Sequence, residues 1–119
     1  MMNCLMVGLG GFIGSVSRYL ISKIPMGFGT GFPVNTFIIN IIGAFAIGCI
    51  ASAAGKDMDA RLLLFLKVGL CGGFTTFSTF SMETTRLMET GQWAAAVSYV
   101  AASTLLGILA VFSAQYILR

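Results

Sequence analysis

Hydrophobic residues dominate four long stretches of the chain, and short polar or glycine-rich connections separate them. The stretches cover about residues 4–24, 33–54, 62–82 and 94–117, and the third has a helical extension towards residue 90. Each is long enough for a helix to cross a hydrocarbon core of roughly 30 Å, because a helix rises about 1.5 Å per residue. We therefore predict one all-α membrane domain over residues 1–119 with four transmembrane helices, antiparallel between neighbours.

Composition places the chain in lipid. It is 57% hydrophobic and 9% charged, whereas soluble domains carry about 25% charged residues. The net charge of +3 does not indicate nucleic-acid binding, because the basic residues lie singly at segment ends. The N-terminus lacks a basic region and a small-residue cleavage site, so we expect the first stretch to remain as a span and not to act as a cleaved signal peptide.

The third stretch contains a polar interruption, from Gly72 to Ser81. It holds two adjacent glycines, five hydroxyl residues and three phenylalanines. Paired glycines weaken a helix by about 1 kcal/mol each relative to alanine, and hydroxyls at membrane depth must find partners. We predict a break in the third helix that lines or binds something. The alternative is a kinked helix whose Ser and Thr side chains bond back to their own carbonyls.

Uncharged polar side chains recur in the other spans. Asn40 lies two turns inside the second stretch, with Thr36 on the same face; its amide either donates to a solute or holds the helices together. Tyr99 and Ser103 lie four residues apart in the fourth stretch, so they face one way. Tyr99 is alternatively an interfacial aromatic anchor.

Phe77 and Phe80 share a face if the chain is helical there. The edge of an aromatic ring carries partial positive charge and can approach a small anion; the alternative is that both rings only fill a core. Arg18 either extends to the lipid headgroups or helps an anion enter. Neutral donors, ring edges and basic residues near the helix ends suit a small anion. Four short helices enclose little volume, which implies an oligomer.

Several activities are disfavoured. The chain has no histidine, and its carboxylates lie in connections or near a membrane boundary, so neither acid–base catalysis nor a proton relay can be built. Glu83, Arg86 and Glu89 could form ordinary surface pairs, which contribute little to stability. The three cysteines lie in apolar stretches and are interpreted as small buried hydrophobes, and no metal-ligand cluster occurs.

The glycine-rich start of the chain indicates helix packing. Residues 8–14 half resemble a dinucleotide fingerprint, but no strand precedes them and Ile13 stands at the third glycine position. Small residues four apart instead allow backbones to approach closely. They are Gly10 and Gly14, Gly11 and Ser15, and Ala44, Gly48 and Ser52.

The basic residues barely favour one orientation in the membrane. Four are expected on the side that holds both termini and three on the other, whereas a clear excess normally marks the cytoplasmic side. We therefore predict that the chain inserts both ways up and assembles as an antiparallel pair. The first group is Lys56, Arg61, Lys67 and Arg119, and the second is Arg18, Lys23 and Arg86.

The sequence as a whole resembles the Fluc (CrcB-type) fluoride channel family. The resemblance rests on Gly10–Tyr19 (GGFIGSVSRY), Phe32–Gly43 (FPVNTFIINIIG) and Gly69–Phe80 (GLCGGFTTFSTF). Asn35 and Phe37 are minor departures, where the family usually has glycine and leucine.

The resemblance implies a dual-topology homodimer in the bacterial inner membrane, with two antiparallel pores that pass fluoride out of the cell and so reduce its toxicity. Phe77 and Phe80 would supply ring edges, and Asn40 would donate to the ion. The other implied pore residues are Tyr99 and Ser103 on the fourth helix, Arg18 near the entrance, and Thr79, Ser81 and Glu83 along an outward polar track. Backbone carbonyls of Gly72 and Thr75 would bind one structural sodium ion at the dimer axis.

Two other functions remain as alternatives. One is a small multidrug-type exporter, which is also a four-span dual-topology dimer but needs a membrane-embedded carboxylate in its first helix. The other is a non-transporting membrane scaffold that uses its small residues only for packing.

Overall fold

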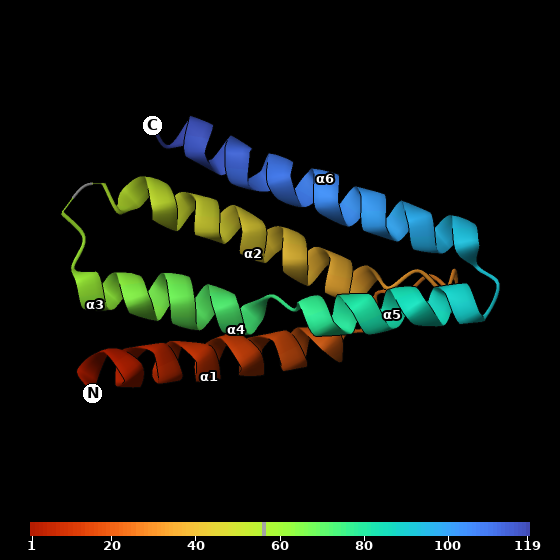
Figure 1. Cartoon of the computed structure of the whole chain (residues 1–119), viewed down its shortest axis with the longest axis horizontal. Helices are drawn as coiled ribbons and strands as arrows, with labels where there is room; N and C mark the ends of the chain where they lie inside the picture. Colours follow the sequence, from red (N-terminus) through yellow and green to blue (C-terminus); the bar gives the residue numbers. More distant parts are fainter. Residues whose placement is uncertain (56) are drawn as a thin grey trace.

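Four long apolar helices make up the protein in a computed structural model that describes residues 1–55 and 57–119. Lys56, one of the basic residues counted above, lies outside the described residues. The spans are α1 (Met2–Ser22), α2 (Val34–Ala53), a composite third helix (Ala60–Glu89) and α6 (Trp93–Ile117). The all-helical architecture and the four spans are confirmed, and both termini lie at one end of the molecule (Figure 1).

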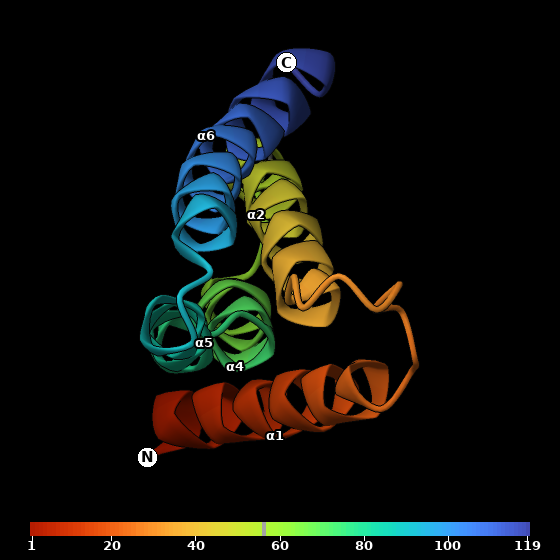
Figure 2. The ribbon, with the colours of Figure 1, turned by 90° about the vertical axis from the view of Figure 1, so that its right-hand side faces the viewer.

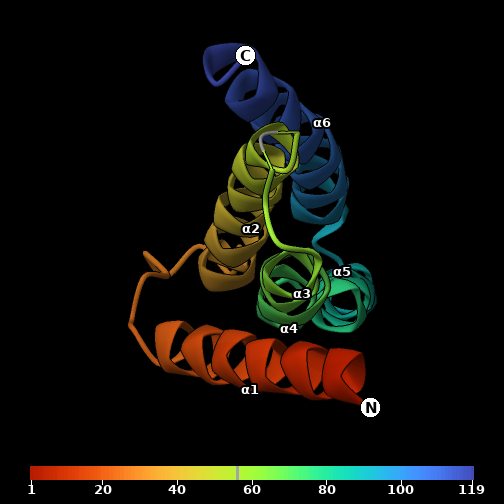
Figure 3. The same cartoon turned by 90° about the vertical axis from the view of Figure 1, so that its left-hand side faces the viewer.

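The third helix is assembled from four segments and occupies the centre. They are α3 (Ala60–Leu63), the π-helical segment η1 (Leu64–Cys71), α4 (Gly72–Phe74) and α5 (Phe77–Glu89). Viewed along the molecule, α4 and α5 lie between α1 on one side and α2 with α6 on the other (Figure 2). The opposite view shows α5 displaced sideways from α3 and α4 (Figure 3). The break therefore offsets the two halves of this helix.

Glycines bring α1 against the first half of the third helix. Gly10 and Gly14 are buried, and a methyl group on either would overlap backbone atoms of the third helix. A methyl on Gly73 would in turn overlap the backbone of Gly11. The predicted packing role of Gly10, Gly14 and Gly11 is confirmed, and it sets the distance between these helices.

A buried glycine also brings α2 close to α6. Gly48 is buried against Val111 and Ala114 of α6, with no room for a side chain. Few large side chains are fully buried, and Tyr99 and Ile39 are the largest of them. Most of the apolar surface therefore faces outwards, as expected for a chain surrounded by lipid.

Asn35 joins the ends of α1 and α2. Its Nδ2 donates to the carbonyls of Ile21 at 2.9 Å and Ile24 at 2.7 Å. The last carbonyls of a helix have no partner within it, and here the amide of Asn35 supplies one. This residue, one of the two departures from the family pattern, thus stabilises the start of the 25–33 connection.

The third helix breaks, but not at the paired glycines. Gly72 and Gly73 remain helical in α4, and the chain becomes extended at Thr75 (ψ 155°) and Thr76 (φ −146°, ψ 119°). Thr76 is the N-cap of α5, and its Oγ1 accepts from the backbone N–H of Thr79 at 3.3 Å. The expectation that the glycines make the break is wrong: Gly73 is needed for contact with α1, and the β-branched, capping threonines end one helix and start the next.

Candidate functional site

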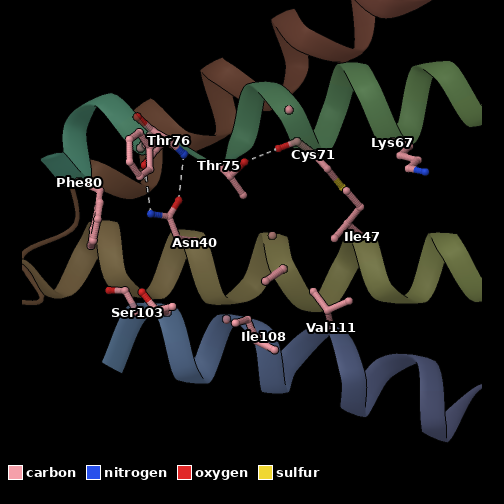
Figure 4. Close-up of a pocket in the computed structure, with 16 residues that line it drawn as sticks. Asn40, Ile47, Lys67, Cys71, Thr75, Thr76, Phe80, Ser103, Ile108 and Val111 are labelled. Atoms are coloured by element: carbon pink, nitrogen blue, oxygen red, sulfur yellow. Dashed lines mark hydrogen bonds between the residues drawn. The ribbon is translucent and has the colours of Figure 1, made fainter. Parts of the chain in front are cut away.

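The break is held by a paired side-chain amide. Asn40 Nδ2 donates to the Thr76 carbonyl at 3.1 Å, and Asn40 Oδ1 accepts from the Thr76 N–H at 2.9 Å (Figure 4). The amide thus pairs with the N–H and the carbonyl of Thr76, which have no helical partner at the break. Because an amide nitrogen carries two hydrogens, one N–H of Asn40 remains for another acceptor.

Arg18 lies at the same break. Its Nε donates to the carbonyl of Gly73 at 3.1 Å, and the hydroxyl of Ser15 lies 3.5 Å from the same oxygen. We expected Arg18 either to reach the headgroups or to stand near a pore entrance. The structure places its guanidinium against the C-terminal end of the first half-helix, where carbonyls without amide partners favour a positive charge.

Backbone carbonyls at the break stay available, those of Gly72 and Thr75 among them. Those of Cys71, Gly73 and Thr76 accept hydrogen bonds from Thr75, Arg18 and Asn40 respectively. In the described part of the chain, no hydrogen bond reaches the carbonyl of Gly72 or Thr75. Both residues line the groove described next. Unpaired carbonyl oxygens are the ligands that hard cations prefer, so these two positions fit a sodium ion.

A groove of about 500 Å³ runs between the third helix on one wall and α2 with α6 on the other (Figure 4). Its polar end is formed by Asn40, Thr76 and Ser103, with the ring of Phe80 beside them. Towards the other end the lining is mainly aliphatic, with Ile47 and Val111 among its residues. An uncharged polar end in an apolar groove can hold a small solute through a few donors.

Ser103 is an unusual donor within this groove. Its Oγ is buried and, among the described residues, has no hydrogen-bond partner. A buried hydroxyl without a partner costs about 1–3 kcal/mol, so a ligand that accepts from it is favoured. The same helix face carries Tyr99 one turn earlier, but Tyr99 is completely buried and does not line the groove.

Three aromatic rings lead away from the groove. The ring centroids of Phe77 and Phe80 are 5.7 Å apart, and those of Phe80 and Tyr99 are 5.0 Å apart. Phe77 lines the groove and is 79% exposed, whereas Phe80 packs against the core around Tyr99. The two phenylalanines thus occupy one face of α5, and only Phe80 is covered within the single chain.

Glu83 accepts hydrogen bonds from the two helices that flank α5. Thr36 Oγ1 donates to Glu83 Oε1 at 2.8 Å, and the Tyr99 hydroxyl donates to Oε2 at 2.7 Å. Of the uses considered for Glu83, a surface pair with Arg86 is not the one the structure shows, since both carboxylate oxygens accept from Thr36 and Tyr99. The side chain faces inwards, because Thr36 and Tyr99 are buried on the two helices that flank α5.

Sequence reasoning missed the hydrogen-bonded triad of Thr36, Glu83 and Tyr99, although a signal was present. Thr36 and Asn40 share one face of α2, and that face meets Thr76 and Glu83, which are seven residues apart on the third helix. A spacing of seven also returns to the same helical face. Two polar positions on one face of each helix indicated a second contact beyond that of Asn40.

Glu83 also lines a second pocket, of about 440 Å³, on the outer side of the triad. This outer pocket lies between the 25–33 connection, the end of α5 and the turn before α6. Its other lining residues are Gly31, Pro33, Arg86, Leu87, Thr90 and Gln92. Glu83 is the residue common to the triad and the outer pocket, so it links the protein interior to the helix ends.

The other hydroxyls of the interrupted stretch bond locally. Ser81 Oγ donates to the Phe77 carbonyl at 3.0 Å, and Thr75 Oγ1 donates to the Cys71 carbonyl at 2.9 Å. Thr79 Oγ1 accepts from Thr76 Oγ1 at 3.1 Å. The broken helix and the back-bonded hydroxyls, considered as alternatives, therefore occur together, and Ser81 has already used its hydrogen within α5.

Comparison with known proteins gives a consistent result. The family model described as CrcB-like protein, Camphor Resistance (CrcB), matches residues 5–115. A protein of Chlorobaculum tepidum named fluoride-specific ion channel FluC is 48% identical over 95% of this chain and 91% of its own length. The protein of the same name from Caulobacter vibrioides is 41% identical over 100% of this chain and 97% of its own length.

Proposed function

The chain belongs to the CrcB-like protein family, and on that premise we propose that it is a fluoride-selective channel, a passive pore without enzymatic activity. The observation that carries this proposal is the buried, unpartnered hydroxyl of Ser103 at the polar end of the groove. The four apolar spans make the protein a multi-pass membrane protein. Since the relatives are bacterial, we assign it to the bacterial inner membrane.

Fluoride is small and strongly hydrated, so loss of its water is the barrier to permeation. Ser103 offers its hydroxyl, Asn40 its second N–H, and Phe77 and Phe80 their ring edges, all uncharged donors within one groove. Replacing hydration by ligands of matched size is the general basis of channel selectivity. A larger anion cannot contact such closely spaced donors at once, and therefore loses its water without compensation.

Beyond the groove, the route continues along the triad. The hydroxyls of Tyr99 and Thr36 now point to Glu83. A hydroxyl hydrogen can rotate, so each can turn to a passing anion and then return to the carboxylate. Thr79 lies on the same segment, next to the Thr76 cap. The outer pocket, which Glu83 also lines, then leads to the helix ends.

The direction of flow follows from the membrane potential. With a negative interior, moving one anion outwards is favoured by ~2.3 kcal/mol per 100 mV. Hydrogen fluoride enters as a neutral acid and ionises inside, so a passive outward leak of fluoride lowers its internal concentration. Protection from fluoride toxicity is the physiological role that we propose.

A second, antiparallel copy of the chain is the proposed partner. The groove is not closed within the single chain, and Phe77, one of its lining residues, is 79% exposed. A large aromatic side chain at the rim of an apolar groove is the kind of anchor that a symmetric partner covers. The nearly balanced basic residues support insertion in both orientations. Tags on both termini, probed in intact cells, should each be accessible in part of the population; a single orientation would contradict the pairing.

A sodium ion is the proposed structural cofactor at the dimer axis. The carbonyls of Gly72 and Thr75 would hold it, because neither accepts a hydrogen bond among the described residues. Each protomer would contribute its own pair, so the ion would join the two breaks by charge–dipole attraction. Broken membrane helices commonly bind sodium through such carbonyls. Replacing sodium by a large organic cation should weaken dimerisation; an unchanged dimer would contradict this site.

The alternative functions are not favoured. The family match supports neither a multidrug-type exporter nor a scaffold, and α1 contains no acidic residue for an exporter to use. Purified protein in sealed vesicles, with a fluoride electrode outside, tests the proposal directly. We expect rapid loss of fluoride while loaded chloride is retained. Vesicles that keep their fluoride, with sodium supplied on both sides, would overturn the proposed function.

A further inference from the structure

We propose that Lys67 attracts fluoride to the pore by raising the local anion concentration at the apolar end of the groove, an inference that rests on the proposed function. Lys67 is exposed on the π-helical segment η1 and lines the groove. The other described lining residues carry no formal charge. The positive charge of this side chain therefore has no neutralising partner in the groove.

The position of Lys67 directs its charge along the groove. Cys71 and Thr75 follow it at intervals of four residues and line the same groove. Figure 4 shows Lys67 on the third helix across from Ile47, at the end opposite to Phe80 and Ser103. An anion that enters at Lys67 thus passes an aliphatic wall before it reaches the donors.

The depth of Lys67 matters in an antiparallel pair. Thr75 lies at the middle of the 30-residue third helix, Lys67 precedes it by eight residues and Glu83 follows it by eight. Each is therefore ~12 Å from the break along the helix. A two-fold axis through the break places Lys67 of one protomer at the depth of Glu83 of the other. The ammonium then offsets, at that depth, the repulsion that a carboxylate exerts on an anion.

A lysine near a membrane boundary has a simpler use, which is to extend its amine to lipid phosphates. The two roles differ in what they predict. Attraction of an anion depends on charge and is screened by salt. A lipid contact leaves the rate of fluoride entering the pore unchanged.

The test compares Lys67→Met, which keeps most of the apolar stem, with Lys67→Gln and with Lys67→Arg, which keeps the charge. Lys23→Met is the matched control, because Lys23 packs over the Tyr19 ring at 4.8 Å and does not line the groove. Fluoride efflux from vesicles is measured at fluoride levels below saturation, with ionic strength at about 0.01 M and then about 1 M, where the screening lengths are about 30 Å and 3 Å.

We expect Lys67→Met and Lys67→Gln to lower efflux about three-fold at low ionic strength and to match the unmodified protein at high ionic strength, since one charge steers modestly. Lys67→Arg and Lys23→Met should both behave like the unmodified protein. Equal efflux of Lys67→Met at low ionic strength, loss in Lys67→Arg, or an equal loss in Lys23→Met would each overturn the assignment. Absence of fluoride efflux from the unmodified protein would instead refute the proposed function itself.

Discussion

The hydroxyl of Tyr99 donates to Glu83 Oε2 over 2.7 Å, and this bond joins α6 to the second half of the third helix inside the protein. The Tyr99 ring is completely buried between Phe32 and Phe80, with centroids at 5.3 and 5.0 Å. The same residue therefore holds the carboxylate of Glu83, which lines the outer pocket. If the proposed route is right, both the stability of the fold and the passage of fluoride depend on this side chain.

Tyr99→Phe removes that bond and keeps the ring. A hydrogen bond to a charged group contributes about 1.5–3 kcal/mol, so we expect a loss of stability of that size. We also expect at least a ~10-fold fall in fluoride flux, since one donor disappears from the route. Thermal unfolding and vesicle efflux measure the two effects. Tyr116→Phe is the control, because Tyr116 is 73% exposed; flux that survives in Tyr99→Phe would remove Tyr99 from the pathway.

Asn40→Asp should lower fluoride flux, whereas the same substitution at Asn35 should not. An ionised aspartate cannot donate to the Thr76 carbonyl or to an anion, and it adds a negative charge beside the groove. We expect fluoride flux to fall ~10-fold or more while the dimer persists by size-exclusion chromatography. Asn35→Asp is matched in chemistry, but its bonds reach only Ile21 and Ile24, so it should affect stability alone. Similar fluxes in the two variants would contradict the role of Asn40.

Phe80→Ile replaces a ring edge by an aliphatic group of comparable hydrophobicity. The variant loses the positive edge that an anion contacts, so we expect lower fluoride flux with a folded dimer. Packing against Tyr99 also weakens, at a cost of about 0.5–1.5 kcal/mol beyond the buried area. Phe12→Ile, at a position 69% exposed on α1, is the control and should leave both flux and stability unchanged. Full activity in Phe80→Ile would exclude its ring from ion contact.

Gly14→Ala tests the close approach of α1 and the third helix. A methyl at this position overlaps the backbone at Leu70 and Phe74, and overpacking of this kind costs about 1–3 kcal/mol. We expect a lower unfolding temperature and a lower yield of dimer. At Gly8 a methyl meets nothing within 4 Å, so Gly8→Ala should be neutral or stabilising by up to about 1 kcal/mol. Equal behaviour of the two variants would show that the helices are not in close contact.

Much of the architecture could be predicted because it depends on local patterns. Apolar length fixed the four spans, and spacing of four residues identified Gly10 and Gly14 as contact positions. The family resemblance was likewise sufficient to place the chain among its relatives. These features are set by the residues of one helix or one short stretch, so the sequence alone carries them.

Features that need two helices were less predictable. The paired glycines appeared to mark the break, but Gly73 is constrained by α1, and Asn40 stabilises the extended backbone at Thr76. Arg18 appeared free near a helix end, although its partner is a carbonyl on another helix. Charge and helix propensity predict which side chains are unfavourable at a position in the membrane. The hydrogen-bond partner of such a side chain is decided by the packing of distant segments.

The break in the third helix is held by hydrogen bonds from two neighbouring helices, so it cannot act as a hinge. Asn40 fixes the backbone at Thr76 from α2, and Arg18 fixes Gly73 from α1. Swinging the second half of the third helix against the first would release the bonds of Asn40 to Thr76 at membrane depth, with no water to replace them. We therefore expect the two halves of the third helix to keep their relative position while fluoride passes.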